Sequence, residues 1–224
     1  MNDWEVLQRV LRERRSIRVF RPDPVSDDDV LRLLDAARQA PSAGNRQPFR
    51  WMVVRHEKTK RQMAEAVREQ VDERMKRFRP DLVDEVDVYG GQLTSFAEAP
   101  ILIVPVFAAA RSSGASSSPG DTTELSLDST LRDNLFSVAA AVTQMLLAAS
   151  TLGLGACWMT GPLLAEERLS TVLGIPAGWR LAGIIPVGVP GETPPSPHRR
   201  PLGRLVLPEP EAAELDELSQ LGGP

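Results

Sequence analysis

Apolar side chains recur at helical spacing in five stretches of the chain, and each stretch predicts a helix. The five predicted helices cover residues 4–11, 27–39, 59–78, 131–152 and 166–173. Ser26, which precedes three aspartates, is typical of a helix N-cap, and Gly153 is typical of a helix end. A further short acidic helix is expected near residues 211–221.

Short apolar runs bounded by proline and glycine predict four strands. They cover residues 51–54, 101–107, 156–159 and 181–189. The run at 101–107 is apolar throughout, which indicates a buried strand. No internal repeat connects these elements, so the pattern favours one sizeable domain.

The predicted helix at 131–152 is apolar around most of its circumference. A helix of this kind must be covered on nearly all sides, and a second subunit is a natural source of the cover. The longest apolar stretch, residues 135–154, is broken by Ser137, Thr143, Gln144 and Ser150, and its alanine content argues against a membrane span. We expect the stripe at the subunit interface to contain Val138, Val142, Met145 and Leu146.

The composition is that of an ordinary globular protein, with 224 residues, 42% hydrophobic and 25% charged. A net charge of −4 without a long basic run argues against nucleic-acid binding. The single cysteine, Cys157, excludes an intramolecular disulfide and favours a reducing cytoplasm, and its apolar surroundings favour a core role over a reactive thiol. The first residues carry charges and no apolar signal region, so we expect a cytoplasmic protein without a membrane partner.

Three cations lie within five residues at positions 14–18, a stretch called here the arginine segment. If it is extended, Arg14, Ser16 and Arg18 project to one side, because strand side chains alternate with period two. Two guanidiniums and a hydroxyl would suit a phosphate and the polar edge of a flavin. The alternative is a solvated basic turn that ends a helix.

Residues 40–48, called here the asparagine loop, contain the proline, glycine and asparagine of a tight irregular loop. The simple interpretation is a connector. Asn45 and Gln47 could also give a ligand paired donors and acceptors, and Gly44 permits a close backbone approach.

Several common chemistries lack their motifs in this sequence. It has no phosphate-binding glycine loop, no dinucleotide glycine fingerprint and no serine elbow beside either histidine. One cysteine and two isolated histidines do not make a zinc site, and no metal is expected. If the protein is an enzyme, a bound cofactor carries the chemistry.

Four motifs together resemble the signatures of the FMN-dependent nitroreductase family. They are residues 14–18, residues 40–48, residues 152–162, and residues 186–188 with 199–202. The resemblance spans about residues 5–205 and implies an α+β sandwich with a mixed, mainly antiparallel sheet flanked by helices. It also implies a homodimer with one FMN at each end of the subunit interface. We therefore expect an FMN-binding domain at 1–205, with an inserted loop at about 110–124, and a C-terminal extension at 206–224.

The resemblance assigns flavin-binding positions in both subunits. Within one subunit it places the phosphate, ribityl chain and pyrimidine edge against Arg14, Arg15, Ser16 and Arg18, with Gln92 facing the pyrimidine ring and Arg199 and Arg200 completing a phosphate clamp. The other subunit contributes Pro41, Ser42 and Asn45. The main chain near Met159, Thr160 and Gly161 is expected to donate to the flavin N5, and no side chain is expected to act as acid or base.

The implied reaction is a ping-pong hydride transfer from NAD(P)H, through FMN, to a small acceptor such as a nitroaromatic or quinone. Thr160 departs from the acidic residue found here in some nitroreductases, which argues against a carboxylate-assisted route. One alternative is a dedicated biosynthetic reductase, because residues 74–82 and 155–158 resemble the domain that acts on a deazaflavin-coenzyme precursor. Another is a flavoprotein that does not turn over or that cleaves its flavin. The sequence does not name the electron acceptor.

Overall fold

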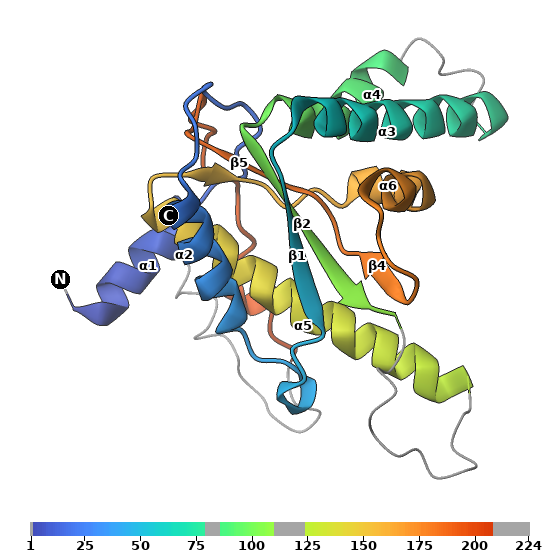
Figure 1. The fold of residues 1–224 in the computed structure, drawn as a ribbon. Coiled ribbons are helices and arrows are strands. Elements are labelled where there is room, and N and C mark those ends of the chain that lie inside the picture. Colours follow the sequence, from blue (N-terminus) through green and yellow to red (C-terminus); the bar gives the residue numbers. More distant parts are fainter. Residues whose placement is uncertain (1, 79–85, 110–123, 208–224) are drawn as a thin grey trace. The chain divides into compact units, whose positions relative to one another are not determined.

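The computed structural model describes residues 2–78, 86–109 and 124–207 (Figure 1). The serine-rich segment at 110–123, the predicted helix at 211–221 and the side chain of Met75 lie outside the described residues. Contacts divide the chain into two compact units, residues 1–194 and residues 195–224. The sheet, its helices and most of the candidate site belong to the first unit.

A five-stranded sheet lies at the centre of the first unit. Its strands are β1 (Phe49–Val54), β2 (Ile101–Ala108), β3 (Gly155–Ala156), β4 (Trp179–Leu181) and β5 (Ile185–Gly188). The main order is β1-β2-β5-β3, and β4 pairs with the far end of β2. The strand pairs are antiparallel, and an isolated parallel bridge joins Ser16 to Ala156. This is the predicted α+β arrangement with a mixed, mainly antiparallel sheet.

Helices cover both faces of the sheet. The α-helices are α1 (Asp3–Glu13), α2 (Asp27–Arg38), α3 (Glu57–Phe78), α4 (Val86–Thr94), α5 (Glu124–Thr151) and α6 (Glu166–Leu173). The 3₁₀ turns are η1 (Ala43–Asn45), η3 (Ser95–Glu98), η4 (Gly161–Ala165) and, in the second unit, η5 (Leu202–Arg204). Figure 1 shows α2 and α5 on one side of the strands and α3, α4 and α6 on the other.

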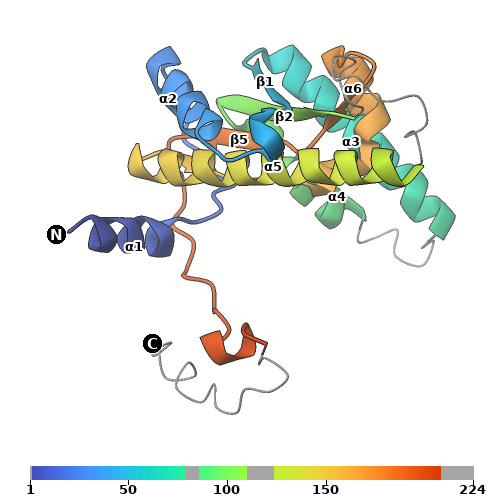
Figure 2. The ribbon, with the colours of Figure 1, turned by 90° about the horizontal axis from the view of Figure 1, so that it is seen from below.

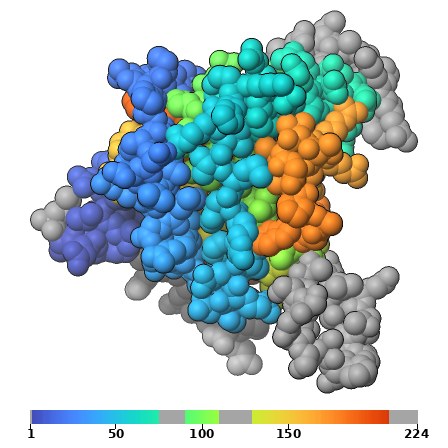
Figure 3. All heavy atoms as spheres, in the orientation of Figure 1, coloured from blue at the N-terminus to red at the C-terminus, as the bar shows by residue number. Residues whose placement is uncertain are grey.

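The alternation of side chains along β2 explains the two layers. Ile101, Ile103 and Phe107 belong to the core shared with α2 and α5, whereas Leu102 and Val104 belong to the core under α3 and α6. A strand with apolar side chains on both faces must be covered on both. β1 forms one edge of the sheet and lies at the surface between α2 and α6 in the space-filling view (Figure 3).

The long helix α5 carries much of the packing. Among the described helices, one stretch, Ser129–Thr151, is long and apolar enough to cross a membrane by length and composition. It contacts α2, β2 and β1, so its apolar character is that of a core helix and is weak evidence for a membrane span. Figure 2 shows α5 passing beneath the sheet with α1 beside its C-terminal end.

The predicted interface stripe on α5 is wrong in its position. Val138, Val142 and Met145 have 0% exposure within this single chain, because they pack in the core against α2 and the sheet. Among the described side chains of α5, the exposed large apolar ones are instead Phe136, at 62%, and Leu135, at 39%. The hydrophobicity of the helix was read correctly, but periodicity alone did not tell which stripe faces the sheet.

Three predicted elements differ from the structure. The strand expected at 156–159 is reduced to β3, followed by an isolated bridge between Met159 and Ile184. The strand expected at 181–189 is divided into β4 and β5 at Gly183, whose φ of 145° interrupts the extended run. Helix α5 begins at Glu124 rather than residue 131, and α4 was not predicted.

Candidate functional site

The arginine segment is extended and follows α1 directly. The N–H of Arg14 ends the helix by donating to the carbonyl of Val10. Beyond it, the N–H of Ile17 donates to the carbonyl of Ala156 at 3.1 Å, which joins the segment to β3. The segment is therefore paired with β3 at Ser16 and Ile17, as an extended run would be. Arg14 lines the same hollow as Arg15 and Ile17, so the shared side of Arg14, Ser16 and Arg18 stays a prediction.

A close contact couples the arginine segment to the glycine-rich motif at 152–156. Ile17 is buried and lies against Gly155. A Cβ on Gly155 would lie 2.7 Å from Cγ2 of Ile17, well inside normal contact. Glycine at position 155 is therefore required by the isoleucine that separates Ser16 from Arg18.

Cys157 is a buried group beside the arginine segment. Burial raises the pKa of its thiol above the ordinary value of 9.0. The charge of Arg18, the hydroxyl of Ser16 and the charge of Arg14 lower the same pKa, and the charge of Glu192 raises it. The burial also confirms that Cys157 is a core residue.

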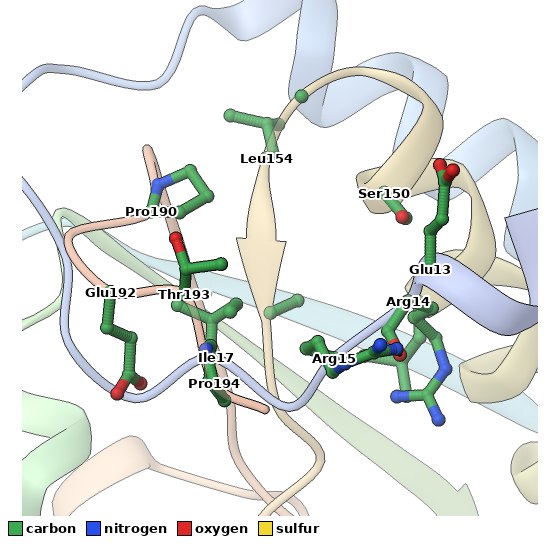
Figure 4. A pocket seen from close by; sticks show the side chains of 13 residues that line it. Glu13, Arg14, Arg15, Ile17, Ser150, Leu154, Pro190, Glu192, Thr193 and Pro194 are labelled. Atoms are coloured by element: carbon green, nitrogen blue, oxygen red, sulfur yellow. The ribbon is translucent and has the colours of Figure 1, made fainter. Parts of the chain in front are cut away.

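The guanidinium of Arg15 bonds to the main chain just before it. Its Nη1 donates to the carbonyls of Arg12 and Arg14, so the guanidinium caps the end of α1. Figure 4 shows Arg14 and Arg15 on one side of a hollow of about 240 Å³, near Ser150 of α5, with Glu192 on the opposite side. The hollow lies between the end of α1, the C-terminal end of α5 and residues 190–194.

The Thr160–Gly161 turn lies a short distance along the chain from β3. Thr160 precedes η4, and the first N–H groups of such a helix have no intrahelical partner. Pro162 has no N–H, so Gly161 supplies the first N–H of the turn. Ala156 and Thr160 are four residues apart, at most about 14 Å. The turn is thus held near the arginine segment.

Helix α4 packs onto this turn. A Cβ on Gly161 would lie 2.4 Å from Cδ2 of Leu93, so the glycine allows the helix to approach. Gln92, the residue before Leu93 on α4, is exposed. The structure therefore brings the helix that carries Gln92 to the Thr160–Gly161 turn.

The asparagine loop is strained and exposed. Gly44, Asn45 and Gln47 all have positive φ, at 58°, 52° and 48°. Conformations of this kind are uncommon for residues other than glycine and gather at functional sites. The loop bonds mainly to itself, through Gln47 N to Ser42 Oγ at 3.0 Å and Gln47 Nε2 to Asn45 Oδ1 at 3.2 Å.

The asparagine loop meets α5 far from the arginine segment. The N–H of Ala43 donates to Oγ of Ser137 at 3.4 Å, and an open hollow of about 310 Å³ lies between the loop and α5 beside Phe136. Ser137 and Ser150, which line the two hollows, are 13 residues apart, or about 20 Å along the axis of α5. The α5 residues lining the two hollows also differ by about a third of a turn around the helix. Within one chain, the predicted residues therefore form two separate groups.

Glu192 was not predicted, although it lies within the arginine segment's surroundings. Its Oε1 accepts hydrogen bonds from the N–H groups of Arg18 at 2.7 Å and Val19 at 3.0 Å. The sequence offered only a lone acidic residue among prolines, with no spacing that links it to residues 174 positions earlier. Arg199 and Arg200 are exposed and belong to the second unit, so their predicted clamp stays a prediction.

Comparison with known proteins gives a family match. The model of the nitroreductase family matches residues 11–189, which is more than half of the chain. A curated protein named NADH dehydrogenase, from Thermus thermophilus, is 31% identical over 201 residues, which cover 87% of this chain and 92% of that protein.

Solved structures agree with this match. A BluB-like flavoprotein from Clostridium difficile has a TM-score of 0.76 and 25% identity, and the alignment covers 90% of this chain and 97% of that one. A Desulfovibrio desulfuricans protein, described as a candidate nitroreductase in complex with FMN, has a TM-score of 0.64 and 28% identity. That alignment covers 95% of this chain and 99% of the other.

Proposed function

The chain belongs to the nitroreductase family, and on this premise we propose that it is an FMN-dependent oxidoreductase. It uses NAD(P)H to reduce a small electron acceptor such as a nitroaromatic or a quinone. The relatives described as a flavoprotein and as an FMN complex support the proposed flavin cofactor. Supporting the electron donor is the relative named NADH dehydrogenase.

The observation that carries the proposal is the pairing of the arginine segment with β3. The bridge between Ser16 and Ala156 brings a set of cationic donors next to the chain that leads to the Thr160–Gly161 turn. A flavin mononucleotide needs both kinds of contact, because it has a phosphate at one end and a ring with polar edges at the other. Residues 14–18 and 155–161 supply them on neighbouring stretches of main chain.

The donor set fits this cofactor. In the part of the chain that the structure describes, neither Arg14 nor Arg18 forms an ion pair with a carboxylate. Two guanidiniums without carboxylate partners are suited to an anionic ligand, which they bind through charge-assisted hydrogen bonds.

The bound cofactor would supply the redox chemistry, accepting hydride from NAD(P)H and passing electrons to an acceptor that enters after the donor has left. The residues of the chain bind and orient. Arg14, Ser16 and Arg18 would hold the phosphate, the ribityl chain and the pyrimidine edge, and the N–H of Gly161 would donate to the ring. Thr160 has no carboxylate, and burial keeps Cys157 a neutral thiol, so neither is placed to act as an acid, a base or a nucleophile.

A second subunit completes the site in this proposal. The asparagine loop and the arginine segment lie about 20 Å apart along α5, so we assign Pro41, Ser42 and Asn45 to the flavin bound by the partner. Exposed Phe136, beside the loop, would then lie in the interface. Helix α1, which has no buried residue and carries Trp4 at 61% exposure, offers a further apolar surface.

We also assign the protein to the cytoplasm, which suits its single, buried cysteine.

The test is to purify the protein, identify any flavin released by heating, and follow its reduction anaerobically by stopped-flow absorbance. The proposal expects FMN, and rapid loss of its visible absorbance on reduction by NADH or NADPH. Bleaching only by a reduced deazaflavin would favour the biosynthetic alternative. A protein that stays colourless and does not bind added FMN would overturn the proposal.

A further inference from the structure

Residues 189–192 run antiparallel beside the chain that follows the arginine segment. Phe20 and Pro190 form an antiparallel bridge. On either side of it, Arg21 N donates to the carbonyl of Val189 and Gly191 N donates to the carbonyl of Val19, both at 2.9 Å. These bonds hold residues 189–191 beside residues 19–21 and place Glu192 next to Arg18.

The carboxylate of Glu192 holds two consecutive N–H groups. Its Oε1 lies 2.7 Å from Arg18 N and 3.0 Å from Val19 N. In a regular strand, consecutive N–H groups point in opposite directions, so one oxygen reaches both only where the chain bends. Glu192 therefore sits at the bend that follows Ser16 and Ile17.

The position of this bend decides where Arg18 points. On the N-terminal side, the segment is held by Ile17, through its bond to Ala156 and its contact with Gly155. On the C-terminal side, Glu192 is the side chain that holds the main chain of Arg18. The guanidinium itself has no ion-pair partner among the described residues, so it depends on its main chain for its direction.

A carboxylate beside the arginines could act on an anionic ligand in two opposite ways. As a charge, it repels a phosphate, and its removal would tighten binding. As a main-chain acceptor, it fixes the geometry of the donors, and its removal would weaken binding. One carboxylate oxygen accepts from both N–H groups, and hydrogen bonds to a charged acceptor are stronger than those to a neutral one. This favours the role of Glu192 as a main-chain acceptor that fixes the geometry of the donors.

We propose that Glu192 is a positioning residue of the flavin site: by accepting from Arg18 N and Val19 N, it holds the bend that directs the side chain of Arg18 toward the ligand. The inference rests on the proposed function, because that ligand is taken to be FMN. It adds a residue that does not touch the cofactor but determines how the residues that bind it are presented.

The experiment compares the FMN affinity of three variants with that of the wild type, by quenching of flavin fluorescence. Glu192→Ala loses the acceptor and should raise the Kd about tenfold. Glu192→Gln keeps a carbonyl oxygen that can accept both bonds and should stay within about threefold of the wild type. Glu13→Gln is the matched control, since it removes a carboxylate from the same hollow without removing a main-chain bond; its Kd should equal or fall slightly below that of the wild type.

A second readout does not need FMN. Amide hydrogen exchange at Arg18 and Val19 should be slow in the wild type and in Glu192→Gln, and at least about tenfold faster in Glu192→Ala. If Glu192→Ala does not fold, Glu192→Gln and the exchange of the wild type still test the contact.

The outcomes separate the inference from the proposed function. Unchanged or tighter FMN binding by Glu192→Ala would overturn the inference alone, as would unprotected amides at Arg18 and Val19 in the wild type. A wild type that binds no FMN would overturn the proposed function and this inference with it, even where the two amides are protected.

Discussion

The arginine segment is held by several distant parts of the chain, whereas the central residues of the asparagine loop, 42–47, bond mainly to one another. Residues 14–18 bond to β3, contact Gly155 and receive the carboxylate of Glu192. Residues 42–47 bond to one another, and their link to the rest of the chain includes one long contact, from Ala43 N to Ser137 at 3.4 Å.

The difference teaches how a site shared by two subunits can be divided. The arginine segment is already arranged before any partner arrives, because its geometry follows from contacts within the chain. The asparagine loop carries backbone strain at Asn45 and Gln47 that few contacts in its own chain offset. In the proposed dimer, the strained loop contacts the partner subunit and the ligand bound there.

The largest expected effect comes from breaking the proposed interface beside the asparagine loop. Phe136→Glu would place a carboxylate in the apolar contact, a cost of several kcal/mol when unpaired. We expect a folded monomer that has lost FMN, measured by light scattering with flavin absorbance. Leu31→Glu is the matched control, because Leu31 on α2 is equally exposed, at 63% against 62% for Phe136. A dimeric Phe136→Glu that keeps its FMN would contradict the interface.

A second change tests how firmly the arginine segment is anchored. Gly155→Ala forces a Cβ to within 2.7 Å of Ile17, and overpacking of this kind costs about 1–3 kcal/mol of unfolding free energy. The double variant Gly155→Ala with Ile17→Ala should be less destabilised than the sum of the two single variants, because the alanine at 17 removes the clash. Denaturant unfolding measures all three, and strictly additive losses would show that the contact is not the cause.

A third pair separates two neighbouring arginines. Arg18→Ala should raise the Kd for FMN about tenfold or more, because it removes charge-assisted bonds to the ligand. Arg15→Ala should raise it by less, because the guanidinium of Arg15 already bonds the carbonyls at the end of α1. Titration by fluorescence quenching compares the two Kd values. An equal loss of FMN affinity in both variants would mean that Arg15 also binds the flavin.

The smallest expected effect concerns strain in the asparagine loop. Asn45→Gly and Asn45→Ala both remove the amide, so each should weaken FMN binding about two- to tenfold. They should differ in stability, because glycine accepts the φ of 52° and alanine does not. We expect Asn45→Ala to lose about 1 kcal/mol more than Asn45→Gly. Equal melting temperatures for the two variants would mean that the loop is not strained.

The fold could be predicted where one local signal dominated. The N-cap at Ser26 and the apolar stripe of α2 gave that helix correctly, and α6 has the predicted bounds. The division of the last strand at Gly183 was missed because a glycine in an apolar run does not reveal its φ. Helix α4 was missed because Gly90 and Gly91 lower helix propensity, and its place depends on packing against α3.

The candidate site could be predicted in its parts but not in its assembly. The pattern indicated an extended arginine segment, and the bridge between Ser16 and Ala156 agrees, whereas the shared side of Arg14, Ser16 and Arg18 stays a prediction. The separation of the two groups of residues along α5 could not be predicted, because it depends on where η1 and α1 pack against that helix. Glu192 could not be found from sequence, because its role is a hydrogen bond across 174 positions.

The central claim is that each flavin site takes the arginine segment from one chain and the asparagine loop from the other. The most direct test mixes two defective chains: one with Arg14→Ala and Arg18→Ala, the other with Ser42→Ala and Asn45→Ala. Each homodimer should bind FMN weakly at both sites. In the purified mixed dimer, one site carries both defects and the other carries none, so we expect one FMN per dimer bound with wild-type affinity. Mixed dimers that bind FMN no better than the two parents would show that both groups act within one chain, and the claim would be wrong.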